Sequence, residues 1–434
     1  MSLHLYNTAT RNVSEFKPLT PGKVGIYLCG ATVQAPPHIG HIRSGVNFDI
    51  LRRWLMASGF DVNFIRNVTD IDDKILQKAA LEKMEWFALA MKYERAFSDA
   101  YKALNVLPPT YEPRATGHIT QMVSLMQKLI DNGHAYAPGN GDVYLEVRSL
   151  KEYLTLSNQK LDDLQSAGDG GDSAKKDPRD FALWKSAKPG EPSWPSHGGG
   201  LDLIFPHHEN EIAQSNAAGY GFAKVWMHNA WVTTSGEKMS KSLGNSLQVQ
   251  ELTKNVRGIE LRWYLGSAHY RSMLEFSHEA LEESATGFRR VEGFLIRAAE
   301  VLGATPEKKI DSEFTKAMND DLAVPTGLAH ISELVKNGNN AIAGGDKKAL
   351  ADSAACVRGA LDMLGCDPFD PAFAGQSANN DGAMDGLVKL ALEQREAARG
   401  RKDFAAADAI RDQIAALGIV IEDTATGPRW SIER

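Results

Sequence analysis

Residues 23–66 constrain the fold most, because they have the pattern of a strand, a helix and a second strand. Residues 23–29 form an apolar run of β type, and residues 60–65 form another. Between them, apolar side chains recur at helical spacing over residues 42–55, and Gly59 follows as a helix end. Such units build parallel, doubly wound sheets, so the segment predicts an α/β fold with a nucleotide site at the carboxyl ends of the strands.

The turn before this helix has the sequence His-Ile-Gly-His at residues 38–41. Gly40 lets the backbone approach a ligand, and the free N–H groups and positive dipole of a helix start favour phosphate. His38 and His41 can donate hydrogen bonds to a triphosphate as pyrophosphate departs, which stabilises charge that grows in the transition state. A pair of ordinary surface histidines is the alternative.

A second motif, Lys-Met-Ser-Lys-Ser, occupies residues 238–242, about two hundred residues after the first. Lys238 and Lys241 would supply point charges for the same phosphates, and the small residues around them would let a loop close. A solvated lysine loop is the alternative. The order of the two motifs and their separation on the scale of a domain favour a split ATP site.

The composition is typical of a folded chain with several domains. It is 43% hydrophobic and 24% charged, and its 434 residues predict about two to four domains. No apolar run approaches the ~18 residues of a membrane span, so a cytoplasmic protein without membrane contact is expected. Three cysteines and a net charge of -7 argue against a disulfide framework and against general binding of polyanions.

The chain resembles the class I aminoacyl-tRNA synthetases and, within them, the cysteinyl-tRNA synthetase family. Besides the two motifs above, the resemblance rests on LCGATV at residues 28–33, NVTDIDDK at 67–74, HGGGLDL at 197–203, FPHHENE at 205–211 and DFAAAD at 403–408. It implies that ATP, with Mg²⁺, forms cysteinyl adenylate from L-cysteine, and that cysteine is then transferred to tRNA(Cys). A monomer is expected.

The resemblance also implies one Zn²⁺ ion in each chain. The metal takes the substrate thiolate as a ligand, so serine is rejected without an editing domain. The ligands carried over are Cys29, His207 and Glu211, and the last two, four residues apart, share one face of a helix. A buried strand thiol is the commoner role for a lone cysteine such as Cys29.

The chain departs from the family between Ser196 and His197. Family members have a further block there, which contains the remaining cysteine ligand, whereas no cysteine of this chain lies between Cys29 and Cys356. A catalytic zinc ion can operate with three protein ligands plus substrate or water. The chain is either a deletion variant or a natural member with a changed site, and a tRNA-binding protein without catalysis is an alternative function.

Further site residues follow from the resemblance alone. Thr32, Thr69 and His118 are expected in the amino-acid pocket. Gly199 and Asp202 are expected near the adenosine of ATP. Ordinary turn, strand-end or structural roles are the alternative for each of these five residues.

The resemblance also implies how the chain is divided. Its parts are a Rossmann-type catalytic domain at residues 1–112 and 200–250, an inserted connective region at 113–199 that is shortened at 196–197, a stem-contact region at 251–310, a helical bundle at 311–367 and a small mixed α/β anticodon-binding domain at 384–434. Strand-type sequence returns at residues 201–205 and 225–232. The stretch 368–383, rich in Pro, Gly, Ser and Asn, is the predicted linker.

The C-terminal part contains two expected helices, at residues 384–399 and 403–417, and two expected strands, at 419–422 and 429–432. Basic residues gather around the turn between the helices, namely Arg395, Arg399, Arg401, Lys402 and Arg411. Such a patch suits RNA phosphates, although charge runs are usually only solvated. The resemblance implies anticodon reading by Phe404, Asp408 and Asp423, because unpaired bases stack on aromatic rings and donate to carboxylates.

A cysteine ligase of mycothiol synthesis is a further alternative, since that enzyme shares the ATP motifs and the zinc site. It should lack a tRNA-reading tail. The C-terminal part therefore decides against it.

Overall fold

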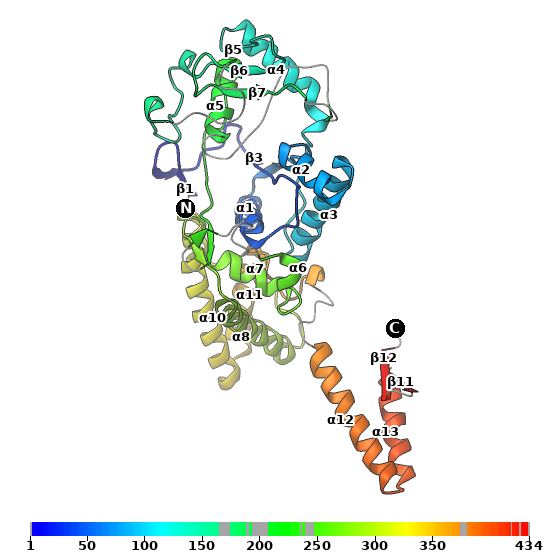
Figure 1. The fold of residues 1–434 in the computed structure, drawn as a ribbon. Helices are drawn as coiled ribbons and strands as arrows, with labels where there is room; N and C mark the ends of the chain where they lie inside the picture. The colour runs from blue at the N-terminus through cyan, green and yellow to red at the C-terminus, as the bar shows by residue number, and fades with distance from the viewer. Residues whose placement is uncertain are drawn as a thin grey trace. The chain divides into compact units, whose positions relative to one another are not determined.

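The structure is a computed structural model that describes residues 2–164, 174–187, 191–192, 207–234, 237–238, 247–373, 380–417, 419–424 and 427–432. The chain forms two compact units. The first contains Met1–Glu251 and Gly258–Phe373, and the second contains Leu252–Arg257 and Ala374–Arg434. Figure 1 shows the order of their elements. None of the described helices is long and apolar enough to cross a membrane.

The predicted strand–helix–strand segment is present as β3 (Lys23–Leu28), α1 (Ile39–Ala57) and β4 (Asp61–Arg66). β3 and β4 are parallel neighbours, so the predicted α/β class with a parallel sheet is confirmed. The core side of α1 consists of the periodic apolar residues that predicted it, and all are buried. Gly59 follows α1 with φ +88°, a conformation that glycine adopts without strain.

Two helices and a second small sheet complete the part of the first unit that surrounds α1. The helices are α2 (Asp73–Glu82) and α3 (Trp86–Ala103). In the sheet, β8 (Val232–Thr234) runs parallel to β10 (Leu274–Glu275) and antiparallel to β9 (Glu237–Lys238). The hairpin at the N-terminus consists of β1 (His4–Asn7) and β2 (Asn12–Glu15).

The prediction of a strand at residues 225–232 is largely wrong, because β8 begins only at Val232. The preceding residues instead bond to distant parts of the chain: the carbonyl of Trp226 accepts from the N–H of Thr8, and the N–H of Ala230 donates to the carbonyl of Tyr270. The strand expected at residues 201–205 lies outside the described residues.

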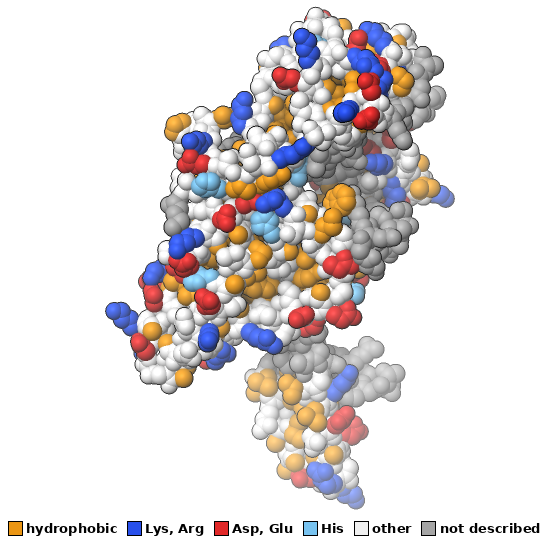
Figure 2. Space-filling model, turned by 90° about the vertical axis from the view of Figure 1, so that its left-hand side faces the viewer, with side chains coloured by type: hydrophobic (Ala, Val, Ile, Leu, Met, Phe, Trp, Pro, Cys, Tyr) orange, Lys and Arg blue, Asp and Glu red, His pale blue; other side chains and the backbone are white. Residues whose placement is uncertain are grey.

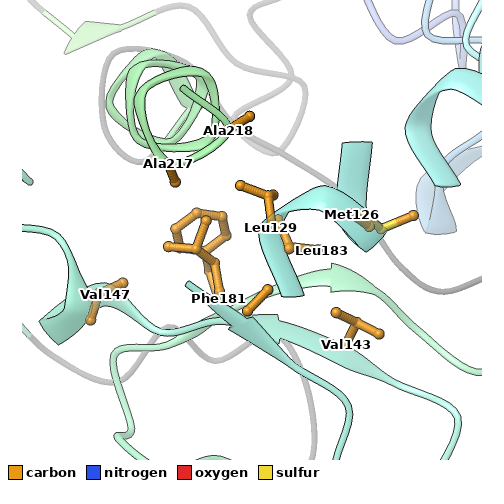
Figure 3. Packing of buried hydrophobic residues seen from close by; sticks show 10 residues of the cluster. Met126, Leu129, Val143, Val147, Phe181, Leu183, Ala217 and Ala218 are labelled. Carbon is orange, nitrogen blue, oxygen red and sulfur yellow. The ribbon is translucent and has the colours of Figure 1, made fainter. Parts of the chain in front are cut away.

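The elements between Ile119 and Ala217 form a region with its own hydrophobic core. It has a three-stranded antiparallel sheet in the order β5 (Ala135–Tyr136), β6 (Val143–Leu145) and β7 (Phe181–Trp184). Two helices pack with it, α4 (Ile119–Asp131) and α5 (His207–Ala217). Figure 3 shows that Ala217 and Ala218, at the end of α5, lie over Phe181 and Leu129 in this core. The sheet and α4 therefore hold α5 by its carboxyl end.

Helices dominate the rest of the first unit, as the sequence predicts. They are α6 (Val249–Leu252), α7 (Gly258–Ser267), α8 (His278–Leu302), α9 (Ser312–Asn319), α10 (Val324–Gly344) and α11 (Lys347–Met363). Gly338 of α10 packs on the ring of Phe294 in α8, where an added Cβ would lie only 2.3 Å from the ring. Arg262 of α7 is fully buried and donates to Asp49 of α1 at 2.6 Å, which ties the helical part to α1.

The second unit contains the two helices and two strands that the sequence predicts. They are α12 (Asn380–Gly400), α13 (Phe404–Ala416), β11 (Ile419–Thr424) and β12 (Gly427–Ile432), and the strands form an antiparallel pair. Their small core contains Val388, Leu392, Ile414 and Ile419. On the face of the molecule seen in Figure 2, the coloured acidic and basic side chains are interspersed, in keeping with the modest net charge.

Candidate active site and metal centre

Four donor side chains meet where β3 ends beside the first turn of α5. The Sγ of Cys29 lies 3.5 Å from Nε2 of His207 and 3.2 Å from Nε2 of His208. Nε2 of His207 lies 3.2 Å from Oε1 of Glu211. The four donor atoms all lie within 4.8 Å of one another. The structure thus brings together the three residues expected as metal ligands and adds His208 to them.

The spacing of these atoms fits a zinc ion. Bonds of about 2.3 Å to sulfur and 2.0–2.1 Å to nitrogen in a tetrahedral site separate neighbouring ligand atoms by about 3.3–3.6 Å. The distance of 3.5 Å from Sγ of Cys29 to Nε2 of His207 falls within that range, and the 3.2 Å to Nε2 of His208 lies about 0.1 Å below it. Thiolate and imidazole donors favour zinc over magnesium or calcium, which prefer oxygen.

Burial shifts the pKa values of Cys29, His208 and the neighbouring His228. Burial, and then the neighbouring Glu211 carboxylate, raises the pKa of the Cys29 thiol. A cation among these side chains would reverse that effect, because it favours the thiolate. Burial lowers the pKa of His208 to about 4 and that of His228 to about 4, so both imidazoles are neutral at pH 7.

Side chains of α5 and of the region around α4 fix the helix that carries three of the donors. The buried carboxylate of Glu209 accepts from the backbone N–H of Ser157 at 2.8 Å, and Oδ1 of Asn210 accepts from the hydroxyl of Tyr153 at 2.8 Å. Nδ2 of Asn132 donates to the carbonyl of Ala217 at 2.7 Å. These bonds set both the position and the rotation of α5.

Gly30 fixes the other side of the cluster. Its N–H donates to Oδ1 of Asn67 at 2.7 Å, directly after Cys29 and beyond the end of β4. An added Cβ at Gly30 would lie 1.6 Å from the backbone oxygen of Asn67. Only glycine fits this close approach, and the approach holds the chain that carries Cys29.

The first motif forms the start of α1. His38 precedes the helix in an extended conformation, and its ring stacks on that of His41 with centroids 3.6 Å apart. Gly40 lies next to the ring of His38, where an added Cβ would approach to 3.0 Å. The predicted placement of both histidines beside a helix N-terminus is therefore seen in the structure.

The second motif begins in β9, whose backbone is described as far as Lys238, and residues 239–246 with Lys241 lie outside the described residues. The chain before the motif lies in the sheet of β8, and the chain after it contacts the start of α1. β9 pairs with β8, and beyond the motif the carbonyl of Leu247 accepts from the N–H of Ile39 at 3.0 Å. The N–H of Val249 donates to the carbonyl of Pro37 at 3.3 Å. Residues shortly after the second motif therefore contact the residues of the first motif.

One cavity of about 1810 Å³ connects the two sets of residues. Its lining includes Cys29, His208 and Glu211 from the donor cluster and the first motif at residues 38–41, apart from Ile39. A ligand that contacts the donor cluster with one end can therefore present its other end to the start of α1. That is the geometry required to join an amino acid to a nucleotide.

Comparisons with known proteins agree with this geometry. The model of the tRNA synthetases class I (C) catalytic domain matches residues 15–196 and 196–286. The cysteine–tRNA ligases of Streptomyces avermitilis and Streptomyces griseus are each 54% identical to this chain over 464 residues, with 100% of this chain and 99% of theirs covered. This chain belongs to the cysteine–tRNA ligase family.

Two further matches lie toward the C-terminus of this family member, a DALR domain at residues 313–366 and the cysteinyl-tRNA ligase anticodon binding domain at 387–430. The structure of methionyl-tRNA synthetase from Mycobacterium tuberculosis in complex with methionyl-adenylate has a TM-score of 0.53 and 16% identity, over 78% of this chain and 89% of that one. That likeness supports the class I fold.

The match to the cysteine–tRNA ligase family is interrupted at one place. The two pieces of the catalytic-domain match meet at residue 196, where the sequence departs from the family pattern. The alignments with the two Streptomyces ligases extend over 464 positions, more than the 434 residues of the chain. Those relatives therefore contain residues that this family member lacks.

Other residues predicted from the family pattern are less closely tied to the cavity. Thr32 and Thr69 pair as a parallel bridge beyond β3 and β4, and Nδ1 of His118 bonds to the carbonyl of Arg114 at 2.9 Å. None of these three is among the described residues that line the cavity. Gly199 and Asp202 lie outside the described residues.

Sequence reasoning missed His208, His228 and Arg43. The signal for His208 was its place beside His207 in FPHHENE, but the spacing argument considered only residues four apart. Arg43 is fully buried and donates to four backbone carbonyls at 2.7–3.3 Å, those of Ala230, Trp231, His269 and Ser272. It therefore ties α1 to the chain that leads into β8.

In the second unit, the ring of Phe404 is 61% exposed at the start of α13. Arg399, in the last turn of α12, and Arg401, in the turn between the two helices, are also exposed. Asp408 is exposed and pairs with Arg411 at 3.2 Å, so a nucleic-acid base would compete with that arginine. The backbone of Asp423 lies in β11, and its side chain is outside the described residues.

Proposed function

We propose that this chain ligates L-cysteine to tRNA(Cys) in the cytoplasm, through cysteinyl adenylate. The observation that carries the proposal is the single cavity lined by Cys29 and Glu211 of the donor cluster and by His38 and His41. The thiol side of cysteine would lie at the donors, and its carboxylate would face ATP at the start of α1.

In the first step, the carboxylate of cysteine attacks the α-phosphorus of ATP, the bond to the β-phosphate oxygen breaks, and pyrophosphate leaves with Mg²⁺. His38 and His41 would donate to the phosphates. Lys238 at the end of β9 and Lys241, three residues further along the chain, would add positive charge. A hydroxyl of the terminal adenosine of the tRNA then attacks the carbonyl carbon, and AMP leaves.

The amino acid would be chosen at a zinc ion held by Cys29, His207 and Glu211. When bound, the ion supplies a soft site for the substrate thiolate, which the harder hydroxyl of serine fills poorly. The tyrosine and backbone groups that hold α5 would keep the two ligands of that helix on one face. Thr32, Thr69 and His118 would shape the rest of the amino-acid pocket, and Gly199 and Asp202 would contact adenosine.

The C-terminal residues 384–434 would read the anticodon. The exposed ring of Phe404 supports this role, because an unpaired base can stack on it while Arg399 and Arg401 contact phosphates. Asp408 and Asp423 would accept hydrogen bonds from base edges. Residues 251–310 would contact the acceptor stem.

The substitution K241A tests the phosphate role. We expect cysteine-dependent exchange between ATP and pyrophosphate to fall on the order of 100-fold, while the affinity for cysteine alone changes little. K224A, at an exposed lysine outside the cavity lining, is the matched control and should leave both quantities unchanged. Equal losses of exchange and cysteine affinity in K241A would contradict the assignment.

A second candidate function is tRNA binding without catalysis. The interruption of the family match at residue 196 favours it, because residues that the related ligases contain are absent from this chain. The same assays separate the two functions. A purified chain that binds tRNA(Cys) but contains no zinc and shows no pyrophosphate exchange would be a binding protein and not a ligase.

A further inference from the structure

We propose that His208 is the fourth protein ligand of the zinc ion, and that a hydrogen-bonded chain through His228 and Thr8 fixes its tautomer. The inference rests on the zinc centre proposed above and changes its composition, from three protein ligands to four. It also gives roles to two residues that no sequence motif singled out.

Nε2 of His208 lies at bonding distance for an ion held by Cys29. This atom lies 3.2 Å from Sγ of Cys29, closer than Nε2 of His207 at 3.5 Å or Oε1 of Glu211 at 4.0 Å. An ion that bonds to Cys29 and His207 at normal lengths can therefore bond to Nε2 of His208 as well, since all of these donor atoms lie within 4.8 Å of one another. A role for His208 as a mere neighbour would require the metal to avoid the donor that is nearest to the thiolate.

The cysteines of the chain supply no second thiolate here. The sequence has three, and Cys356 and Cys366 are both buried in or just after α11. The thiol of Cys366 lies 3.7 Å from the carbonyl of Leu364. Among the described residues, the group of possible ligands around Cys29 contains one sulfur, two imidazoles and one carboxylate. The formal charges of thiolate and carboxylate would cancel those of Zn²⁺.

Hydrogen bonds on the other side of the His208 ring link it to His228 and Thr8. Its Nδ1 lies 3.0 Å from Nε2 of His228, and Nδ1 of His228 lies 2.8 Å from Oγ1 of Thr8. If Nε2 of His208 bonds to metal, its proton is on Nδ1 and is donated to His228, which in turn donates to Thr8. Metal-bound histidines commonly donate their second N–H in this way, which orients the ring.

The ring of Trp226 packs against the rings of both His208 and His228. Its centroid lies 5.4 Å from that of His208 and 6.5 Å from that of His228, and it is nearly parallel to the second ring, at 12°. The alternative proton arrangement places N–H on Nε2 of His208, which would then donate to the Cys29 sulfur. The two arrangements predict different numbers of imidazoles on the metal, and that number can be measured.

Cobalt substitution of the full-length chain tests the proposal directly. With Co²⁺ in place of zinc and a non-thiol reductant present, H208C should roughly double the sulfur-to-cobalt charge-transfer absorbance, because a second thiolate enters the coordination sphere. H278C, which adds a thiol at an exposed position at the start of α8, is the matched control and should leave the spectrum unchanged. Cobalt bound to H208C with the unaltered absorbance of one thiolate would overturn the proposal.

Zinc K-edge X-ray absorption of the unmodified protein tests it without any substitution. We expect one sulfur and two imidazoles around the ion. One sulfur with a single imidazole would overturn the role of His208 and leave the three-ligand centre intact. A chain that binds no zinc would overturn both, while pyrophosphate exchange would still report separately on the adenylation function.

Discussion

At the scale of single residues, the site depends on contacts that leave no room for a side chain. Gly30 is the clearest case, because its backbone meets the carbonyl of Asn67 while its N–H bonds to the side-chain oxygen of the same residue. Both contacts hold the chain directly after Cys29. The position of a metal ligand therefore depends on a neighbour that has no side chain.

We expect G30A to lower the affinity for zinc on the order of 10- to 100-fold, because the added Cβ forces the chain that carries Cys29 away from Asn67. The measurement is zinc competition with a chromophoric chelator. G25A in β3 is the matched control, since nothing lies within 4 Å of a Cβ added there. Equal zinc affinities in the two variants would contradict this account of Gly30.

At the scale of elements, the sequence pattern predicts those helices and strands whose formation depends on residues close to them in the chain. The β3–α1–β4 segment follows from its periodicity and from Gly59, since the helix and the two strands are close in sequence. β8 was predicted too early, because the residues before it bond to Thr8, Tyr270 and Arg43. His208 was missed because the family resemblance and the spacing of four selected only His207 and Glu211 from α5, and no spacing within one helix reports the contact of His208 with Cys29.

The ligand helix α5 depends on a core that lies apart from the metal cluster. We expect F181A to reduce the stability of that core by about 3–5 kcal/mol, because it removes the ring beneath Ala217 and leaves a cavity. Hydrogen exchange of amides in α4 and β6 measures the loss, and zinc affinity should fall with it. F87A, at a ring 54% exposed on α3, is the control. Similar exchange in both variants would show that Phe181 does not support α5.

At the scale of the whole molecule, the two units divide the proposed reaction. Adenylation needs only residues of the first unit, since the donor cluster, the first motif and the flanks of the second all belong to it. The exposed Phe404 belongs to the second unit. Amino-acid activation and tRNA selection should therefore respond separately to substitution.

We expect F404A to raise KM for tRNA(Cys) about tenfold, because stacking of one base contributes about 1–3 kcal/mol, and to leave pyrophosphate exchange unchanged. Steady-state aminoacylation measures the first quantity. L417A removes another exposed apolar side chain of the same unit, 76% exposed, and should change neither quantity. An unaltered KM in F404A would remove Phe404 from the tRNA contact.

The way α5 is attached also bears on how such a chain can change in evolution. Among the described residues, Asn132 at the carboxyl end and residues 153–157 along one side set its register. Additions and losses of sequence ahead of the helix can therefore accumulate without rotating its histidines and carboxylate. A ligand helix fastened from behind tolerates length variation in front of it.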